Sequence, residues 1–191
     1  MHPYEVAQTL RSRAKHESVR LNYGSLYGVV EALEAKRLVR ARETVREGRR
    51  PERTIYEITD AGHVELVDWL SDLIAAPAKE YLQFEAALSF IVVLPPDDAM
   101  MLLTQRARAL EVQLAQHHSV RHAVEGDGLP RLFLLEDEYV THLLEAELDW
   151  VRRLVKDMET GALDGLDLWR SFSEGDRRPF GDVAPPTPPT D

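Results

Sequence analysis

Cysteine is absent from the 191 residues of this chain. Its absence excludes disulfide bonds, thiolate metal sites and a cysteine nucleophile, and it fits a reducing compartment such as the cytosol. Long apolar runs are lacking too: a run such as residues 91–94 falls far short of the roughly 18 residues that a membrane-spanning helix needs. No basic segment followed by an apolar one opens the chain as a signal peptide would. We therefore expect a cytoplasmic protein with no membrane segment.

Motifs for catalysis and metal binding are also lacking. The sequence has no nucleophile elbow, phosphate-binding loop or paired-carboxylate motif, so we expect neither an enzyme nor a cofactor. His118 and His122 lie four residues apart, a spacing that lets two side chains on one helix face share a metal. Because no third ligand follows from the sequence, we interpret them as solvated histidines and expect no metal.

Charge is divided unevenly along the chain. A net charge of −10 would argue against binding to nucleic acid, because carboxylates repel phosphates. Residues 1–60, however, hold 12 Lys+Arg and 9 Asp+Glu, a net of +3, whereas the remainder holds 11 and 24, a net of −13. This division indicates a DNA-binding N-terminal segment, although arginines that merely solvate a surface are the alternative.

The first part of the sequence has the pattern of a winged helix. Residues 22–36 carry apolar side chains at helical spacing, and Asn22 is placed to cap this helix. Strand-like segments at 38–44 and 54–58 flank an arginine-rich turn, and Thr59 precedes another apolar helical segment. A helix, a strand, a cationic turn and a second strand, in this order, are what a winged-helix DNA-binding domain requires.

The remaining sequence is almost wholly helical in pattern. Residues 81–94 are expected to form one apolar helix, which two prolines end. The next helix repeats apolar residues every three and four positions, the period of helices that pack as a coiled coil. Residues 132–158 form a second long helical segment, and Gly161 ends it. We thus predict a mainly α fold: a winged helix-turn-helix domain with a two-stranded β wing at 1–76, an α-helical dimerisation domain at 77–162 and a largely disordered tail at 163–191.

Four short segments carry a family resemblance. Residues 1–5 (Met-His-Pro-Tyr-Glu), residues 24–27 (Gly-Ser-Leu-Tyr), the wing and helix start at 48–62, and residues 80–95 occur in order with compatible spacing. In these segments the chain resembles the PadR family of bacterial transcriptional regulators. The resemblance implies a winged helix, dimerisation through C-terminal helices and release from DNA by small, often phenolic, molecules. The family has an apolar helix before the His-x-Tyr-Glu segment, and this sequence has no residues there. Either Met1 is internal to a longer protein, which we favour, or the domain is shortened.

The recognition helix has an unusually smooth side. When Leu26 and Val30 face the core, Gly24 and Gly28 fall on the opposite side of the helix. Each glycine costs about 1 kcal/mol of helix stability relative to alanine, a cost that close approach of the backbone to DNA would justify. The hydroxyls of Ser25 and Tyr27 flank this side and can reach phosphates or base edges. The alternative is that Tyr27 packs against the wing and Ser25 faces water.

Arginines dominate the remaining DNA-binding candidates. Guanidinium groups at the wing match phosphate oxygens bidentately, although Arg53 can instead pair with Glu52 or Glu57. Lys15 and Arg20 are second-rank phosphate contacts. The complete predicted set is Lys15, Arg20, Asn22, Tyr23, Gly24, Ser25, Tyr27, Arg46, Arg49, Arg50 and Arg53.

Two further groups are predicted in the helical part. The coiled-coil period leads us to expect a homodimer held by Met100, Leu103, Ala107, Leu110, Leu114, Leu143 and Trp150. His117 and Arg121 interrupt this period, and we interpret them as polar residues that specify the interface. A small aromatic effector could bind between helices lined by Trp69, Phe133, Tyr139 and Trp150, although aromatic residues at helical spacing are usually core.

Together these features predict a DNA-binding transcriptional regulator that acts in the cytoplasm at the nucleoid. We expect a homodimeric repressor that binds a pseudo-palindromic double-stranded operator and is released by the effector. The alternatives are a winged-helix protein-interaction module or a ligand-sequestering module that does not bind DNA. The cationic turn argues against the interaction module, which does not need three arginines at a turn tip. The ligand-sequestering module is favoured only if an aromatic compound binds while DNA does not.

Overall fold

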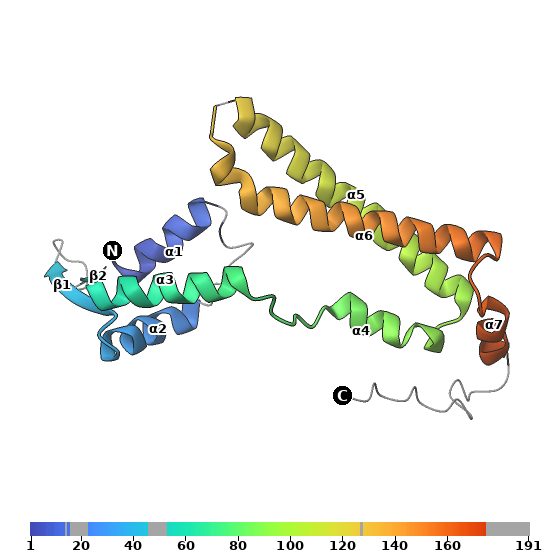
Figure 1. The fold of residues 1–191 in the computed structure, drawn as a ribbon, viewed down its shortest axis with the longest axis horizontal. Helices are drawn as coiled ribbons and strands as arrows, with labels where there is room; N and C mark the ends of the chain where they lie inside the picture. Colours follow the sequence, from blue (N-terminus) through green and yellow to red (C-terminus); the bar gives the residue numbers. More distant parts are fainter. Residues whose placement is uncertain (14, 16–22, 46–52, 127, 175–191) are drawn as a thin grey trace. The chain divides into compact units, whose positions relative to one another are not determined.

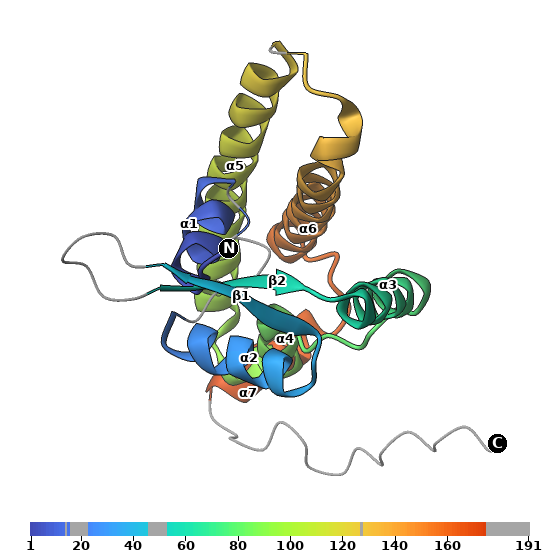
Figure 2. The same ribbon diagram turned by 90° about the vertical axis from the view of Figure 1, so that its left-hand side faces the viewer.

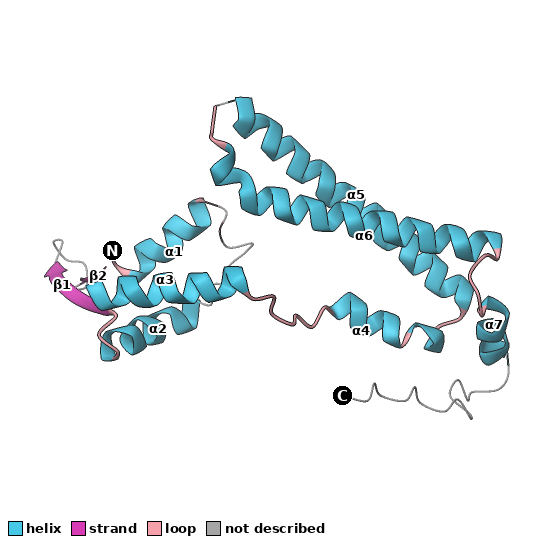
Figure 3. Ribbon diagram, viewed as in Figure 1, coloured by secondary structure: helices cyan, strands magenta, loops and turns pink. Residues whose placement is uncertain are grey.

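The structure is a computed structural model of the chain, and it describes residues 1–13, 15, 23–45, 53–126 and 128–174. The chain divides into two compact units, Met1–Glu80 and Tyr81–Asp191, which are considered separately (Figure 1). Helices predominate in both, and the described strands form a single two-stranded sheet (Figure 3). The predicted fold class, mainly α with a two-stranded wing, is confirmed.

The first unit contains three helices and the sheet. Its elements are α1 (Pro3–Ser12), α2 (Tyr23–Ala35), β1 (Val39–Val45), β2 (Arg53–Ile58) and α3 (Asp60–Ala75). The strands pair antiparallel from Val39 opposite Ile58 to Val45 opposite Arg53, with an irregularity between Ala41 and Glu43. Figure 2 shows them side by side as a hairpin, with α2 running along one side.

Two contacts hold the start of α3 against the turn before β1. Thr59 caps α3: its Oγ1 accepts a hydrogen bond of 3.0 Å from the amide of Gly62 and donates to the carbonyl of Arg37. Gly62 lies so close to the turn before β1 that a Cβ atom there would come within 2.0 Å of the Leu38 carbonyl oxygen. Only glycine permits this approach, so the start of α3 and the start of β1 are held together.

The second unit is built on a long helical hairpin. Its elements are α4 (Gln83–Ser89), the 3-10 helix η1 (Ile91–Val93), α5 (Pro96–Gly126), a second 3-10 helix η2 (Arg131–Leu134), α6 (Leu135–Thr160) and α7 (Leu166–Glu174). Helices α5 and α6 lie antiparallel along most of their length (Figure 1). Leu148, Val151 and Met158 of α6 are buried in the same core as the apolar residues of α5.

Two predictions about this unit are wrong. Residues 81–94 do not form one helix, because α4 ends at Ser89, Phe90 leaves the helical conformation at φ −118°, and a 3-10 turn follows. Residues 163–191 are not a structureless tail throughout: α7 buries Leu166 and Trp169 in the core. Gly161 does end α6 at φ 72°, but the chain turns back there and forms another helix. Residues 175–191 lie outside the described residues.

Candidate nucleic-acid interface

One side of the first two turns of α2 is exposed and carries two glycines. Gly24, Ser25, Tyr27 and Gly28 are exposed there, and we call these four residues the reader face. Leu26, Val30 and Leu33, on the other side, are half-buried within the first unit. A Cβ atom built at Gly28 would meet no atom within 4 Å, so packing inside the unit does not require this glycine. The helix keeps a stability cost there that the fold itself does not explain.

The aromatic ring at the edge of the reader face is positioned by α1. Tyr27 lies edge-on to the imidazole of His2, with ring centroids 6.0 Å apart at 70°, and about half of its surface remains exposed. His2 is itself fixed, because its Nδ1 accepts a hydrogen bond from the amide of Tyr4 and Glu5 closes a capping box. Tyr27 therefore packs against the N-cap residue of α1. This role of His2 was not predicted from the sequence.

Most of the predicted wing lies outside the described residues. Arg46, Arg49 and Arg50 belong to the segment between β1 and β2 that is not described, and Arg20 and Asn22 belong to the one before α2. Arg53 is half-buried at the first position of β2, opposite Val45. Tyr23 begins α2, and Lys15 is half-buried just after α1.

The strand β1 adds cations that were not predicted from the sequence. Arg40 and Arg42 are exposed, and the Nε of Arg40 donates a hydrogen bond of 2.7 Å to Glu57 on β2. Arg42 Nε lies 4.0 Å from the same carboxylate. One carboxylate thus faces two guanidinium groups, so β1 contributes positive charge to the unit that contains the reader face. The sequence places them two residues apart in a strand-like segment, and this spacing could have predicted that both lie on one face of the strand.

The coiled-coil period of α5 is satisfied within the chain. Leu103, Ala107, Leu110 and Leu114, here called the seam, are all buried and share one core with α6. Met100 is half-buried beside them, whereas Leu143 and Trp150 are exposed on α6. The seam therefore offers little exposed surface to a second chain. Of the residues predicted to hold a dimer, only the two on α6 are placed on the surface.

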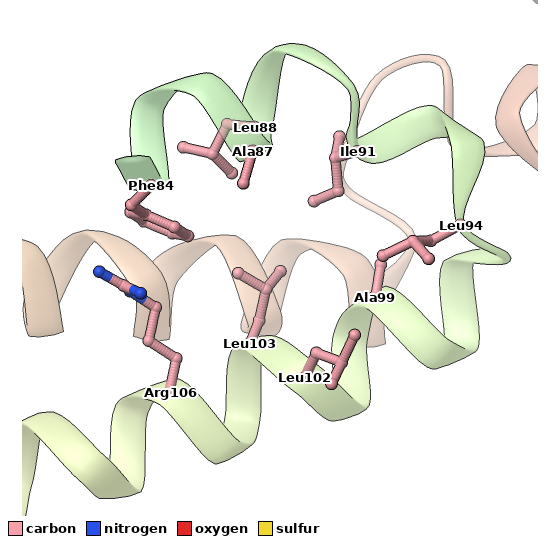
Figure 4. Close-up of a pocket in the computed structure, with 9 residues that line it drawn as sticks. All are labelled: Phe84, Ala87, Leu88, Ile91, Leu94, Ala99, Leu102, Leu103 and Arg106. Atoms are coloured by element: carbon pink, nitrogen blue, oxygen red, sulfur yellow. The ribbon is translucent and has the colours of Figure 1, made fainter. Parts of the chain in front are cut away.

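The predicted effector residues are spread over the two units, and two of them lie far apart on one helix. Tyr139 and Trp150 are eleven positions apart on α6, which separates them by about 16 Å along the helix axis, too far for one small ligand. Phe133 and Trp69 are exposed, and Trp69 belongs to the first unit. One cavity of the second unit lies between α4, η1 and α5, and none of the four aromatic residues lines it (Figure 4).

A polar cluster ties α5 to α6 near their connection. Asp137 of α6 accepts hydrogen bonds from His117 Nδ1 at 2.6 Å and from Arg121 Nη2 at 2.8 Å, and Arg121 also reaches the buried Thr141. Partial burial acts to raise the pKa of Asp137, but the hydrogen bonds from His117 and Arg121 outweigh it and lower that pKa below its usual value. The predicted polar specifiers therefore bridge two helices of one chain.

Potential metal ligands are scattered over the described residues. No group of three that could hold a metal occurs in that part of the chain. His118 is exposed, with its Nε2 3.7 Å from Glu145.

Every described helix is too short or too polar to span a bilayer.

Comparison with known proteins shows what this chain resembles in sequence and in fold. Residues 1–68 match the transcriptional regulator PadR-like family. Bacillus subtilis PadR in complex with operator DNA has a similar fold, with a TM-score of 0.70 and 17% identity over 83% of this chain and 91% of that one. The complex of the same protein with p-coumaric acid has a TM-score of 0.68 and 15% identity over 83% of this chain and 90% of that one. The PadR-like transcriptional regulator BC1756 of Bacillus cereus has a TM-score of 0.56 and 12% identity over 84% of this chain and 91% of that one.

A search of curated protein sequences gave no match. The assignment therefore rests on the sequence match of the first unit and on the fold of the described chain. The resemblance of this chain to the PadR-like family of transcriptional regulators is thus confirmed for residues 1–68.

Proposed function

We propose that the protein is a homodimeric transcriptional repressor whose reader face enters the major groove of a pseudo-palindromic operator. The observation that carries this proposal is the exposed glycine surface of α2, at which nothing packs beside Gly28. A helix with a smooth, uncharged start can approach base edges closely, and the first residues of a recognition helix are the ones that reach them. The family match of residues 1–68 to transcriptional regulators supports the same function.

The wing would supply contacts that do not depend on sequence. Arg49 and Arg50 fall between β1 and β2 in the sequence, and their guanidinium groups could bind phosphates beside the groove. Arg40 and Arg42 extend the positive charge along β1. The acidic second unit, by contrast, would be repelled by the duplex, so the molecule would bind DNA through the first unit alone.

The dimer needs a surface other than the seam. On α6, Leu135, Tyr139, Leu143 and Trp150 are exposed, and we call them the α6 stripe. At 100° per residue they share one side of the helix, roughly opposite Leu148 and Val151. An uncovered apolar stripe of this kind is typical of a protein–protein contact. We therefore place the dimer contact on this stripe.

An effector would act by favouring one spacing of the two DNA-binding domains over another. The similar Bacillus subtilis PadR has been solved both with operator DNA and with p-coumaric acid. By analogy, we propose that a small aromatic molecule releases this protein from its operator. Such a ligand shifts the equilibrium only if it binds the form that does not fit DNA more tightly.

The alternative is a protein-interaction or ligand-sequestering module that has kept this fold without binding DNA. The exposed apolar residues of α3 and α6 would suit a partner protein. An interaction module, however, has no need for glycines on an exposed helix side next to a cationic turn. Direct measurement of DNA binding distinguishes the two.

The decisive experiment is fluorescence anisotropy of the full chain with duplexes selected from a random pool and with scrambled duplexes, across a salt series. The double variant Arg49→Ala/Arg50→Ala should weaken binding to all sequences and reduce the salt slope by about one for each phosphate that is no longer bound in each half-site. Arg108→Ala, on the exposed surface of α5, removes the same kind of charge elsewhere and is the control. Unchanged affinity and slope in the double variant would remove the wing from the interface, and no binding of wild type to any duplex would favour the interaction module.

A further inference from the structure

The carboxylate of Glu57 is shared between two arginines of the opposite strand. Arg40 of β1 and Glu57 of β2 are direct partners in the antiparallel hairpin (Figure 2), so their side chains project from the same face of the sheet. The Nε and Nη2 of Arg40 both lie 2.7 Å from Oε1 of Glu57. The other carboxylate oxygen, Oε2, lies 4.0 Å from the Nε of Arg42. Each oxygen of one carboxylate thus faces a different guanidinium group.

Arg42 is left out of the strand pairing. Ala41 lies opposite Tyr56 and Glu43 lies opposite Ile55, so Arg42 is the extra residue of a bulge in β1. The side chains of Arg40 and Arg42 are 69% and 66% exposed, whereas that of Glu57 is 34% exposed. The two guanidinium groups are therefore more accessible to a large anion such as DNA than the carboxylate that they share.

This carboxylate opposes contact between β1 and the DNA backbone. A phosphate bound to Arg40 would lie beside the negative charge of Glu57, which repels it. The guanidinium would also have to divide its N–H donors between two anions. Because affinity for the DNA backbone comes from cations that neutralise phosphates, an arginine already held by a carboxylate contributes less to it.

We propose that Glu57 restrains DNA binding by engaging the guanidinium groups of Arg40 and Arg42. This inference rests on the proposed function, because it concerns how strongly the same interface holds a duplex. Phosphate contacts carry no sequence information, so the restraint lowers the affinity for the operator and for other DNA by a similar factor. The reader face then contributes a larger share of the total binding than it would beside two unpaired strand arginines.

The variant Glu57→Gln removes the charge with little change of shape. The glutamine carbonyl can still accept a hydrogen bond from Arg40. An exposed ion pair contributes little to stability, so the variant should fold, and thermal unfolding checks this. Glu65→Gln is the matched control, because Glu65 is exposed on α3 of the same unit and carries the same charge. Arg40→Ala, alone and combined with Glu57→Gln, shows whether the effect passes through Arg40.

The measurement is fluorescence anisotropy of the full chain with a selected and a scrambled duplex across a salt series. Glu57→Gln should bind both duplexes more tightly, by about threefold to twentyfold at low salt, since one surface charge interaction is worth up to about fivefold and the proposed dimer contains two. The salt slope should steepen by about one for each half-site. The gain should be smaller when Arg40 is already alanine, and Glu65→Gln should bind like wild type.

Three results would overturn this inference and leave the proposed function intact. The first is a wild type that binds DNA while Glu57→Gln binds no more tightly than Glu65→Gln. The second is weaker binding by Glu57→Gln, because Glu57 would then position the arginines for DNA. The third is a gain of equal size with and without Arg40, because general repulsion would then account for it. Failure of wild type to bind any duplex would overturn the proposed function and this inference with it.

Discussion

The indole Nε1 of Trp169 donates a hydrogen bond of 2.8 Å to the carbonyl oxygen of Leu94, 75 residues earlier in the chain. This bond joins α7 to the end of η1, and Leu166 is buried in the same core. Helix α7, which follows a turn with two glycines, therefore packs against the core of the second unit. The stability of this unit depends on residues that lie beyond the long hairpin.

Removal of the Trp169 side chain should destabilise the second unit. Trp169→Ala should cost about 3–5 kcal/mol, because it leaves a large cavity in a packed core. Trp169→Phe keeps much of the apolar bulk and loses the hydrogen bond, so we expect a smaller cost. Urea unfolding followed by circular dichroism measures both. Leu168→Ala, at a position 59% exposed, is the control and should change stability by less than about 0.5 kcal/mol; equal effects of the two alanine variants would contradict the role of α7.

Substitution of Gly28 should change stability and DNA binding in opposite directions. Gly28→Ala places a methyl group in open space on a helix, so the first unit should become more stable by about 0.5–1 kcal/mol. On the proposed function the same methyl intrudes between α2 and the bases and should weaken operator binding. Thermal unfolding and anisotropy on one preparation give both values. The reader face would be contradicted if the variant were stabilised and bound DNA as well as wild type does.

The sequence predicted the first unit well because its signals are local. Thr59 caps α3, and the strand boundaries lie within one residue of the predicted ones, since caps and period-two alternation are set by near neighbours. The burial of Trp169 was missed, because it depends on contacts between distant segments, such as the hydrogen bond to Leu94.

The sequence could not show which chain buries the seam residues. A coiled-coil period states that a helix side is buried but does not state by which chain. Leu110 could equally have faced a second subunit, and only the position of Val151 beside it in one core shows otherwise. The effector prediction had the same weakness, because aromatic residues at helical spacing do not reveal which of them share a cavity.

Two leucine substitutions should separate folding from dimerisation. Leu110 is 5% exposed within the hairpin, so Leu110→Asp should unfold the second unit, as an unpaired buried charge costs several kcal/mol. Leu143 is 50% exposed on the α6 stripe, so Leu143→Asp should leave the helices intact and dissociate the dimer. Light scattering should give about twice the 21.8 kDa chain mass for wild type and the single mass for Leu143→Asp. A wild-type monomer at micromolar concentration would refute the dimer, and a dimeric Leu143→Asp variant would move the contact elsewhere.

The pH dependence of stability should contain a contribution from Asp137. Hydrogen bonds from His117 and Arg121 overcome the effect of burial and hold the pKa of Asp137 below the unfolded value of 3.8. A carboxyl group with a depressed folded pKa stabilises the fold above its unfolded pKa and loses that contribution as pH falls through the folded one. Asp137→Asn should therefore cost about 1.5–3 kcal/mol near neutral pH, the range for hydrogen bonds to charged groups.

The difference between wild type and Asp137→Asn should shrink as pH falls below 3.8, because the unfolded carboxyl gains a proton there before the folded one does. Urea unfolding at a series of pH values measures it. Asp167→Asn is the matched control, because the side chain of Asp167 is 97% exposed and its ion pair with Arg170 lies on the surface, where such pairs contribute little. A difference for Asp137→Asn that does not vary with pH would show that its cost comes from packing and not from the charge that His117 and Arg121 stabilise.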